Sequence, residues 1–170
     1  MSFDACMPII LQSEGGFVNN LADPGGATNL GITIGTLSAW LGRPATVADV
    51  QALTPASVAP IYQKNYWDAA SCGSWDAGVD LMVFDMAVNQ GVGRAIKTLQ
   101  SALGVTADGA VGPATQAAAE LATASDLISK ISTAREAFYR SLSTFSTFGT
   151  GWLNRLTRTT ALAQQMAQAS

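Results

Sequence analysis

Glu14 has the residue type and the setting that most favour chemistry in this chain. It follows the apolar run MPIILQS, directly precedes two glycines, and is one of only three glutamates among 170 residues. Desolvation by apolar neighbours disfavours the charged form of a carboxyl, so such a group can carry a proton near neutral pH and act as a general acid. The alternative interpretation is a solvent-facing residue at the end of a helix.

Asp23 lies nine residues after Glu14, in the turn-forming stretch LADPGG. A hairpin that folds back over the helix end would place Asp23 across a cleft from Glu14, where it could orient a water or stabilise positive charge on a sugar ring. Thr28, Asn29 and Thr33 on the returning strand could hold a water or a sugar hydroxyl. Asp before Pro is also a common turn former, and this role alone accounts for Asp23.

Asp85 and Asn89 are two further candidate residues, in the mostly apolar segment VDLMVFDMAVNQG at residues 79–91. Asp85 lies inside the predicted helix, and Asn89 lies one turn later on the same face. Such a pair usually forms an internal hydrogen bond that ties a helix to a loop, and we favour this structural role. The other interpretation places both side chains in a cleft, where they would bind an N-acetyl group or a hydroxyl.

The chain contains no histidine, which removes the usual zinc sites, Ser-His-Asp triads and Cys-His pairs from consideration. Cys6 and Cys72 are isolated cysteines without metal-binding spacing. A disulfide between them is possible, although two reduced and buried thiols are the expectation for a protein that folds in the cytoplasm. Carboxylates must therefore carry any chemistry.

Charge is distributed unevenly along the chain. Residues 1–126 contain 4 Lys and Arg against 11 Asp and Glu, whereas residues 127–170 contain 5 against 1. The acidic majority argues against a nucleic-acid-binding protein. The basic C-terminal part indicates either solvated helix faces, the simpler interpretation, or a surface that holds an anionic partner. Under the second interpretation the cations would be Arg135, Arg140, Arg155 and Arg158.

Apolar runs in the sequence are far shorter than the roughly 20 residues that a membrane-spanning helix needs. The first stretch, MSFDACMPIILQSE, has neither the basic start nor the cleavage region of a signal peptide. We therefore expect the chain to be made and folded in the cytoplasm.

Hydrophobic periodicity predicts a mainly α fold with a small β-hairpin after the first helix. The first helix begins after Ser2 and carries Glu14 at the inward edge of its last turn, before two glycines end it. Turn-forming residues indicate an irregular hairpin over 17–35, and STFSTFGTG at 143–151 indicates a flexible connection. Further helices are predicted over residues 36–41, 46–53, 55–67, 79–90, 94–103, 113–122, 127–142 and 152–166.

Five motifs, in their order and approximate spacing, resemble glycoside hydrolase family 108: EGGFVNNLADPGGATNLGIT, IYQKNYWD, FDMAVNQG, LGVTADGAVGPAT and FGTGWLNR. This family comprises muramidases, namely phage endolysins and related lysozymes that serve lysis or toxin secretion. The resemblance extends from residue 3 to about residue 158. It implies a single compact, lysozyme-like domain over 1–170, with a catalytic half at 1–91 and a helical half at 92–165 similar to the family's predicted peptidoglycan domain.

The resemblance implies an N-acetylmuramidase that cleaves the β-1,4 bond between N-acetylmuramic acid and N-acetylglucosamine in peptidoglycan. Glu14 would be the catalytic acid, assisted by Asp23 and Thr28, without a metal or organic cofactor. Carboxyl separations of about 5 Å and about 6.5–9.5 Å distinguish retaining from inverting enzymes, and the sequence leaves both open. Candidate substrate contacts are Asn29, Thr33, Tyr66, Asp85 and Asn89.

Some positions fit the sugar-binding interpretation less well. Ala27 and Leu30 stand where charged and aromatic residues are common in the family, which could weaken sugar stacking without affecting the acid. Tyr62, Tyr66 and Trp67 come at i, i+4 and i+5 spacing in IYQKNYWD. This spacing is more typical of core packing than of a sugar platform.

The resemblance implies peptidoglycan glycan strands as partner, a holin or secretion pore that gives the enzyme access to the wall after release, and a monomeric state. A second hypothesis is a non-catalytic peptidoglycan-binding or secretion-assisting protein on the same fold, which would have no reason to retain an acid beside two glycines. A DNA-binding helical domain is a third hypothesis, disfavoured by the acidic character of residues 1–126.

Overall fold

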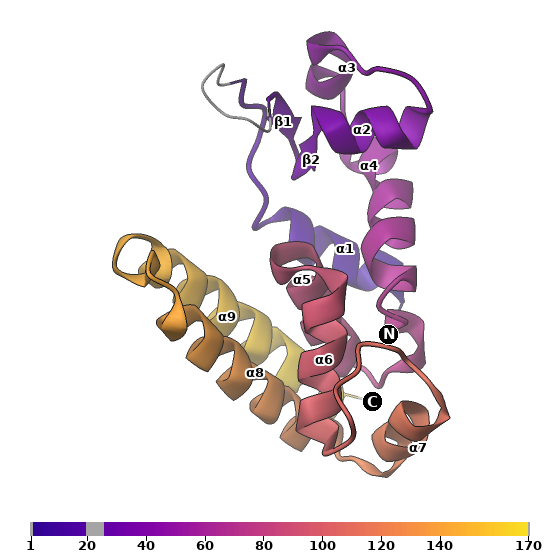
Figure 1. Cartoon of the computed structure of the whole chain (residues 1–170), viewed down its shortest axis with the longest axis vertical. Coiled ribbons are helices and arrows are strands. Elements are labelled where there is room, and N and C mark those ends of the chain that lie inside the picture. The colour runs from indigo at the N-terminus through magenta and orange to yellow at the C-terminus, as the bar shows by residue number, and fades with distance from the viewer. Residues whose placement is uncertain (1, 20–25, 170) are drawn as a thin grey trace. The chain divides into compact units, whose positions relative to one another are not determined.

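The computed structural model describes residues 2–19 and 26–169, and in this part of the chain the fold is mainly α (Figure 1). Nine α-helices are present there, and one two-stranded antiparallel hairpin follows the first helix. The predicted fold class is therefore confirmed. The chain forms two compact units, a smaller one over Asp4–Asn65 and a larger one over Tyr66–Ser170 together with Met1–Phe3.

The first helix, α1 (Phe3–Leu11), is shorter than the sequence predicts. After Leu11 the amides of Ser13 and Glu14 donate to carbonyls three residues back, those of Ile10 and Leu11. These are the tighter bonds of a 3-10 turn, which commonly ends a helix. The prediction that Glu14 belongs to the last α-helical turn is therefore wrong: Glu14 lies in the turn that follows the helix.

A two-residue turn joins β1 (Thr28–Asn29) to β2 (Ile32–Thr33). Thr28 pairs with Thr33 and Asn29 with Ile32, and both central residues have positive φ, 49° at Leu30 and 74° at Gly31. Positive φ at both positions defines a type I′ turn, whose twist matches that of the flanking strands. On the other side, Thr28 forms an antiparallel bridge with Val18.

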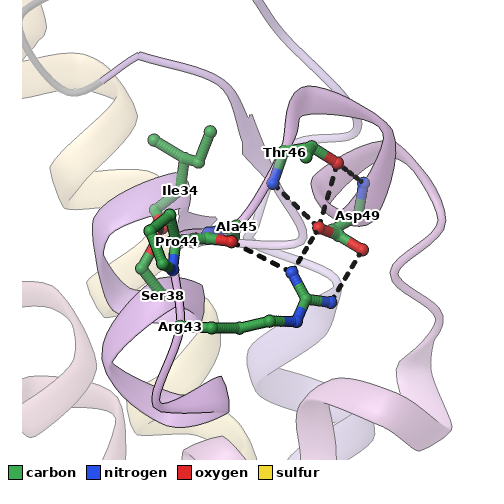
Figure 2. Close-up of polar contacts among 7 residues, drawn as sticks. All are labelled: Ile34, Ser38, Arg43, Pro44, Ala45, Thr46 and Asp49. Atoms are coloured by element: carbon green, nitrogen blue, oxygen red, sulfur yellow. Dashed lines mark hydrogen bonds and ion pairs between the residues drawn. The ribbon is translucent and has the colours of Figure 1, made fainter.

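Three helices and a π-helical segment complete the smaller unit and lead into the larger one: α2 (Ile34–Leu41), α3 (Val47–Gln51), α4 (Pro55–Tyr62) and η1 (Gln63–Asp68). Figure 2 shows how polar contacts hold the α2–α3 connection. Arg43 donates to both carboxylate oxygens of Asp49, at 3.0 and 3.2 Å, and Asp49 also accepts from the backbone amide and hydroxyl of Thr46. Thr46 in turn caps α3, which completes a capping box.

The larger unit is built around α5 (Val79–Gln90), which is buried at every position from Val79 to Ala87. Glycine at position 78 allows the start of α5 to approach α9, because a Cβ there would overlap the carbonyl of Ala163. In the core of this unit, Trp67 contacts the rings of Phe3 and Phe84 edge to face, and these two rings also contact each other. The other elements are η2 (Cys72–Ser74), α6 (Val92–Leu103), α7 (Pro113–Leu121), α8 (Ala124–Ser141) and α9 (Phe145–Gln168).

The long helix α9 lies beside α8 (Figure 1) and begins at Phe145. The prediction of a flexible connection over 143–151 is therefore wrong, since most of this segment is helical. Glycine costs about 1 kcal/mol in a helix relative to alanine, yet here the bare Gly149 gives space to the ring of Phe145 one turn earlier. Trp152 also stacks on Tyr139 of α8, with ring centroids 5.3 Å apart. This packing outweighs the weak local propensity.

The loop LGVTADGAVGPAT is organised by the buried side chain of Gln100. Its carbonyl accepts from the Gly109 amide at 2.8 Å, and its amide donates to the Asp108 carboxylate at 2.8 Å and the Ala110 carbonyl at 3.0 Å. The helix α7 then begins at Pro113, the first helical position that proline favours. Within residues 2–19 and 26–169, no helix has the length and apolarity to cross a membrane.

Candidate active site

Glu14 is half-buried and lies where the chain leaves α1 to run beside the hairpin. The amide of Leu30 donates to the carbonyl of Gly15 at 3.0 Å, and Val18 and Thr28 exchange two backbone hydrogen bonds of 2.8 Å. The segment that carries Glu14 is therefore attached to the hairpin at two points. Gly15 and Gly16 border open space, since a Cβ at either position would meet nothing within 4 Å.

Gly31 is the point at which the Glu14 carboxyl, the hairpin turn and α4 meet. A Cβ at position 31 would lie 2.8 Å from Oε2 of Glu14 and would overlap the hydroxyl of Tyr62. Both side chains therefore lie directly against the Cα of Gly31. Tyr62 is buried, and its hydroxyl donates to the carbonyl of Leu30 at 2.9 Å. Position 31 requires glycine for two reasons, its positive φ and this close approach.

This arrangement can support general acid chemistry. Glu14 is partly shielded from solvent, and the backbone on which it rests is held by strand pairing and by a buried tyrosine. A carboxyl fixed in this way can deliver a proton to one defined position of a bound substrate, and fixed geometry is the main requirement for such a transfer.

Thr28 and Thr33, two further candidate site residues of the smaller unit, have structural partners. Thr28, half-buried on β1, pairs through its backbone with both Val18 and Thr33. The Thr33 hydroxyl caps α2 by accepting from the amide of Thr36 at 3.1 Å. Asp23 lies outside the described residues. Roles of these groups in catalysis or substrate binding remain predictions.

Asn29 anchors the hairpin to the end of α3. It is buried, and its side-chain amide donates to the carbonyl of Val50 at 3.0 Å and to that of Gln51 at 3.3 Å. Carbonyls at the C-terminus of a helix lack an i+4 amide partner within the helix, and Asn29 supplies a donor to two of them. The structure thus gives Asn29 a supporting role behind the hairpin, and a substrate contact is only a prediction.

Asp85 belongs to the larger unit and is fully buried between two arginines. Its carboxylate accepts from Arg135 at 2.7 Å and from Arg155 at 2.9 Å. Tyr139 accepts from Arg135 at 3.2 Å and donates to Asn89 at 2.7 Å. The favoured prediction of an Asp85–Asn89 pair is therefore corrected: the two residues are connected through Arg135 and Tyr139. Their roles in substrate binding remain predictions.

The same network corrects the expectation of a wall-binding surface made by four arginines. The side chain of Arg135 is fully buried and that of Arg155 is 12% exposed, and both pair with Asp85. A signal for the burial of Arg135 was present in the sequence, because Arg135 continues the stripe of Ile128 and Ile131 at helical spacing. Nothing in the local sequence indicated that Asp85 would be its partner.

Aromatic residues of the IYQKNYWD motif are mostly core residues. Tyr62 and Trp67 are buried, which confirms their predicted packing role. Tyr66 is half-buried within η1 and remains a predicted substrate contact. In the described part of the chain, no three His, Cys, Asp or Glu side chains are grouped closely enough to hold a metal ion.

Comparisons with known proteins show which families this chain resembles. Residues 7–91 match the family model described as glycosyl hydrolase 108, and residues 94–157 match the one described as predicted peptidoglycan domain. A solved structure, titled "Structure of Brucella abortus SagA", is 43% identical in sequence, with a TM-score of 0.86. The match covers 97% of this chain and 95% of that one. A search of curated proteins found no match.

Proposed function

Since this chain belongs to the glycosyl hydrolase 108 family, we propose that it is an N-acetylmuramidase with Glu14 as general acid. It would cleave the β-1,4 bond between N-acetylmuramic acid and N-acetylglucosamine. The family resemblance predicted from the five motifs is confirmed, and with the peptidoglycan domain it makes the chain a glycoside hydrolase directed at peptidoglycan. The cleaved bond and the role of Glu14 are the parts proposed here.

The observation that carries the proposal is the position of Glu14 against Gly31. The carboxyl lies against the hairpin turn, which is held by the Tyr62 hydroxyl and by the backbone hydrogen bond between Leu30 and Gly15. A general acid contributes only when its proton is within hydrogen-bond reach of the leaving oxygen. The EGG segment and the type I′ turn together form a fixed support for the carboxyl.

In the proposed reaction, Glu14 donates its proton to the glycosidic oxygen while the bond from this oxygen to C1 of N-acetylmuramic acid breaks. The N-acetylglucosamine side leaves with a hydroxyl group, and Glu14 becomes a carboxylate. In an inverting course, a water molecule adds its oxygen to C1 as this bond breaks and gives up one proton to the Asp23 carboxylate. In a retaining course, Asp23 first bonds to C1 through a carboxylate oxygen, and water then displaces it from C1 while giving up one proton to Glu14. Thr28 would help to hold this water.

The test compares clearing of purified peptidoglycan sacculi by the wild type, Glu14→Gln and Glu136→Gln. Glu136 is an exposed glutamate paired with Arg140, so its variant is a matched control for the chemical change. We expect Glu14→Gln to slow clearing on the order of 10²–10⁴-fold, with an unchanged circular dichroism spectrum, and Glu136→Gln to match the wild type. Borohydride reduction of the products should label N-acetylmuramic acid, the newly formed reducing end.

Three outcomes would contradict the proposal. Full clearing by a folded Glu14→Gln variant would remove Glu14 from the mechanism. Labelling of N-acetylglucosamine in place of N-acetylmuramic acid would assign the enzyme to the other glycosidic bond. If the wild type and Glu14→Gln both bind sacculi and neither cleaves them, the non-catalytic hypothesis is correct. The anomer formed first, read by NMR, distinguishes retention from inversion.

A further inference from the structure

The larger unit contains an open groove between α6 and α8 that the proposed reaction does not use. One section, of about 670 Å³, is lined largely by small residues at the end of α6 and along α8, among them Ala102, Gly104, Ala134 and Ala137. A second section, of about 610 Å³, shares Ser101 and Ala134 with the first. The two sections therefore form one continuous groove, and small side chains in its floor allow a bound chain to approach closely.

Three exposed cations line this groove, while no acidic residue does. Lys130 lies in the first section, and Arg94 and Lys97 lie in the second. Among residues 2–19 and 26–169, none of the three forms an ion pair with a carboxylate. In a chain of net charge −3, a groove with only positive charge is a local reversal of sign. Such a surface favours an anionic partner.

The surroundings of Arg94 and Lys97 hold these cations in place. The guanidinium of Arg94 lies over the ring of Phe138, 3.9 Å from its centroid, which leaves the edges of the guanidinium as hydrogen-bond donors. Lys97 lies against Gly109 and faces Asp108. The Asp108 carboxylate already accepts from the Ala110 amide and from Gln100, and these bonds hold its pKa below the usual range. Both of these bonds go to one oxygen of the Asp108 carboxylate, and its charge also interacts with that of Lys97, so Asp108 offsets part of the positive charge at this end of the groove.

We propose that the α6–α8 groove binds the acidic stem peptide of peptidoglycan, the short peptide attached to N-acetylmuramic acid. This inference rests on the proposed function in taking peptidoglycan as substrate. The stem peptide carries carboxylates along an extended backbone, which matches cations spaced along a floor of small residues. No aromatic ring lines either section, so the stacking surface that sugar rings prefer is missing. The three cations all fall within residues 94–157, which match the peptidoglycan domain.

Binding is tested in the full-length Glu14→Gln variant, which keeps the substrate intact. A synthetic stem peptide, Ala-Glu-diaminopimelate-Ala, is titrated by calorimetry into this protein and into versions that also carry Lys97→Gln, Lys130→Gln or both. We expect each single change to weaken binding about 2–5-fold, the range of exposed charge pairs, and added salt to weaken it further. Lys64→Gln in the smaller unit removes the same charge from an exposed lysine and should change nothing.

Catalysis is tested separately with otherwise wild-type protein. Lys97→Gln/Lys130→Gln should cleave intact sacculi more slowly, yet cleave peptide-free glycan strands, prepared with an amidase, at the wild-type rate. An unaffected stem-peptide affinity, or no binding of the peptide at all, would overturn the proposal. Loss of binding to peptide-free strands would assign the groove to glycan and would also overturn it. Failure of the muramidase proposal is distinguishable, because it would appear in the clearing and end-labelling assays of the wild type and Glu14→Gln, whatever the affinity for the stem peptide.

Discussion

Tyr62 donates a hydrogen bond of 2.9 Å from its hydroxyl to the backbone carbonyl of Leu30, thirty-two residues earlier in the chain. The amide of the same Leu30 donates to the carbonyl of Gly15. Leu30 has a φ of 49°, a left-handed conformation that costs a non-glycine residue about 1–2 kcal/mol. Both of its backbone polar groups are thus used to hold a strained turn in the place where it supports Glu14.

Replacing Gly31 with alanine should damage both stability and activity. The left-handed φ should cost about 1–2 kcal/mol, and overlap with Glu14 and Tyr62 should add about 1–3 kcal/mol. Displacement of Glu14 by about 1 Å should slow clearing of sacculi on the order of 10²-fold. Urea unfolding and a turbidity assay measure the two effects.

Gly42→Ala is the matched control for this change. Gly42 also has a positive φ, 66°, but a Cβ there would meet nothing within 4 Å. This variant should show the backbone cost alone and full activity. Equal losses of stability in the two variants would contradict the close contact of Gly31 with Glu14 and Tyr62.

Asp85→Asn should destabilise the protein by about 3–5 kcal/mol, because it leaves two arginines in the core without a counter-charge. Adding Arg135→Met should recover part of this loss, since one of the uncompensated buried charges is then removed. Glu136→Gln breaks an exposed ion pair and should cost less than about 1 kcal/mol. The free energy of unfolding in urea is the measurement.

The same variant separates the structural role of Asp85 from the substrate contact considered from sequence. A substrate contact would raise KM for soluble glycan oligomers and leave the free energy of unfolding unchanged. Our expectation is the opposite: a large loss of stability and, at a temperature where the variant is folded, a KM close to that of the wild type.

Asp49 should make the stability of the smaller unit depend on acid pH. Its pKa lies well below the usual range, first because of the Arg43 hydrogen bond and then because of the Thr46 amide and hydroxyl (Figure 2). A folded-state pKa below the unfolded value of about 3.9 stabilises the fold fully above that value, and the stabilisation is lost as pH falls below it. Asp49→Asn should therefore lower the urea midpoint at pH 7 and differ less from the wild type near pH 3.

Asp68→Asn, at an exposed residue of η1, is the control for this pH series. Its urea midpoint should follow that of the wild type at both pH values. A gap between Asp49→Asn and the wild type that is the same at pH 3 and pH 7 would show that the Arg43–Asp49 contact does not contribute through the charge of the carboxylate.

Much of the fold was predictable because local patterns define it. The mostly apolar segment 79–87 indicated a helix, and it forms the buried part of α5. Gly-Pro at positions 112–113 indicated a helix start, and α7 begins at Pro113. The EGG motif indicated Glu14 as the candidate acid beside a hairpin. In the structure, three backbone hydrogen bonds attach the segment that follows Glu14 to this hairpin. These features depend on residues that are close in sequence, so local sequence patterns are enough to predict them.

Only the tertiary structure decided which partner each polar group has. Asn29 belongs to the end of α3, and Asp85 belongs to Arg135 and Arg155, fifty and seventy residues later in the chain. Periodicity reports that a face is buried, but it carries no information on the element that covers it. The start of α9 within a glycine- and threonine-rich segment has the same origin, since contacts with α8 outweighed propensity. Sequence thus indicated the candidate acid and the hairpin beside it, and packing determined the contacts that hold them.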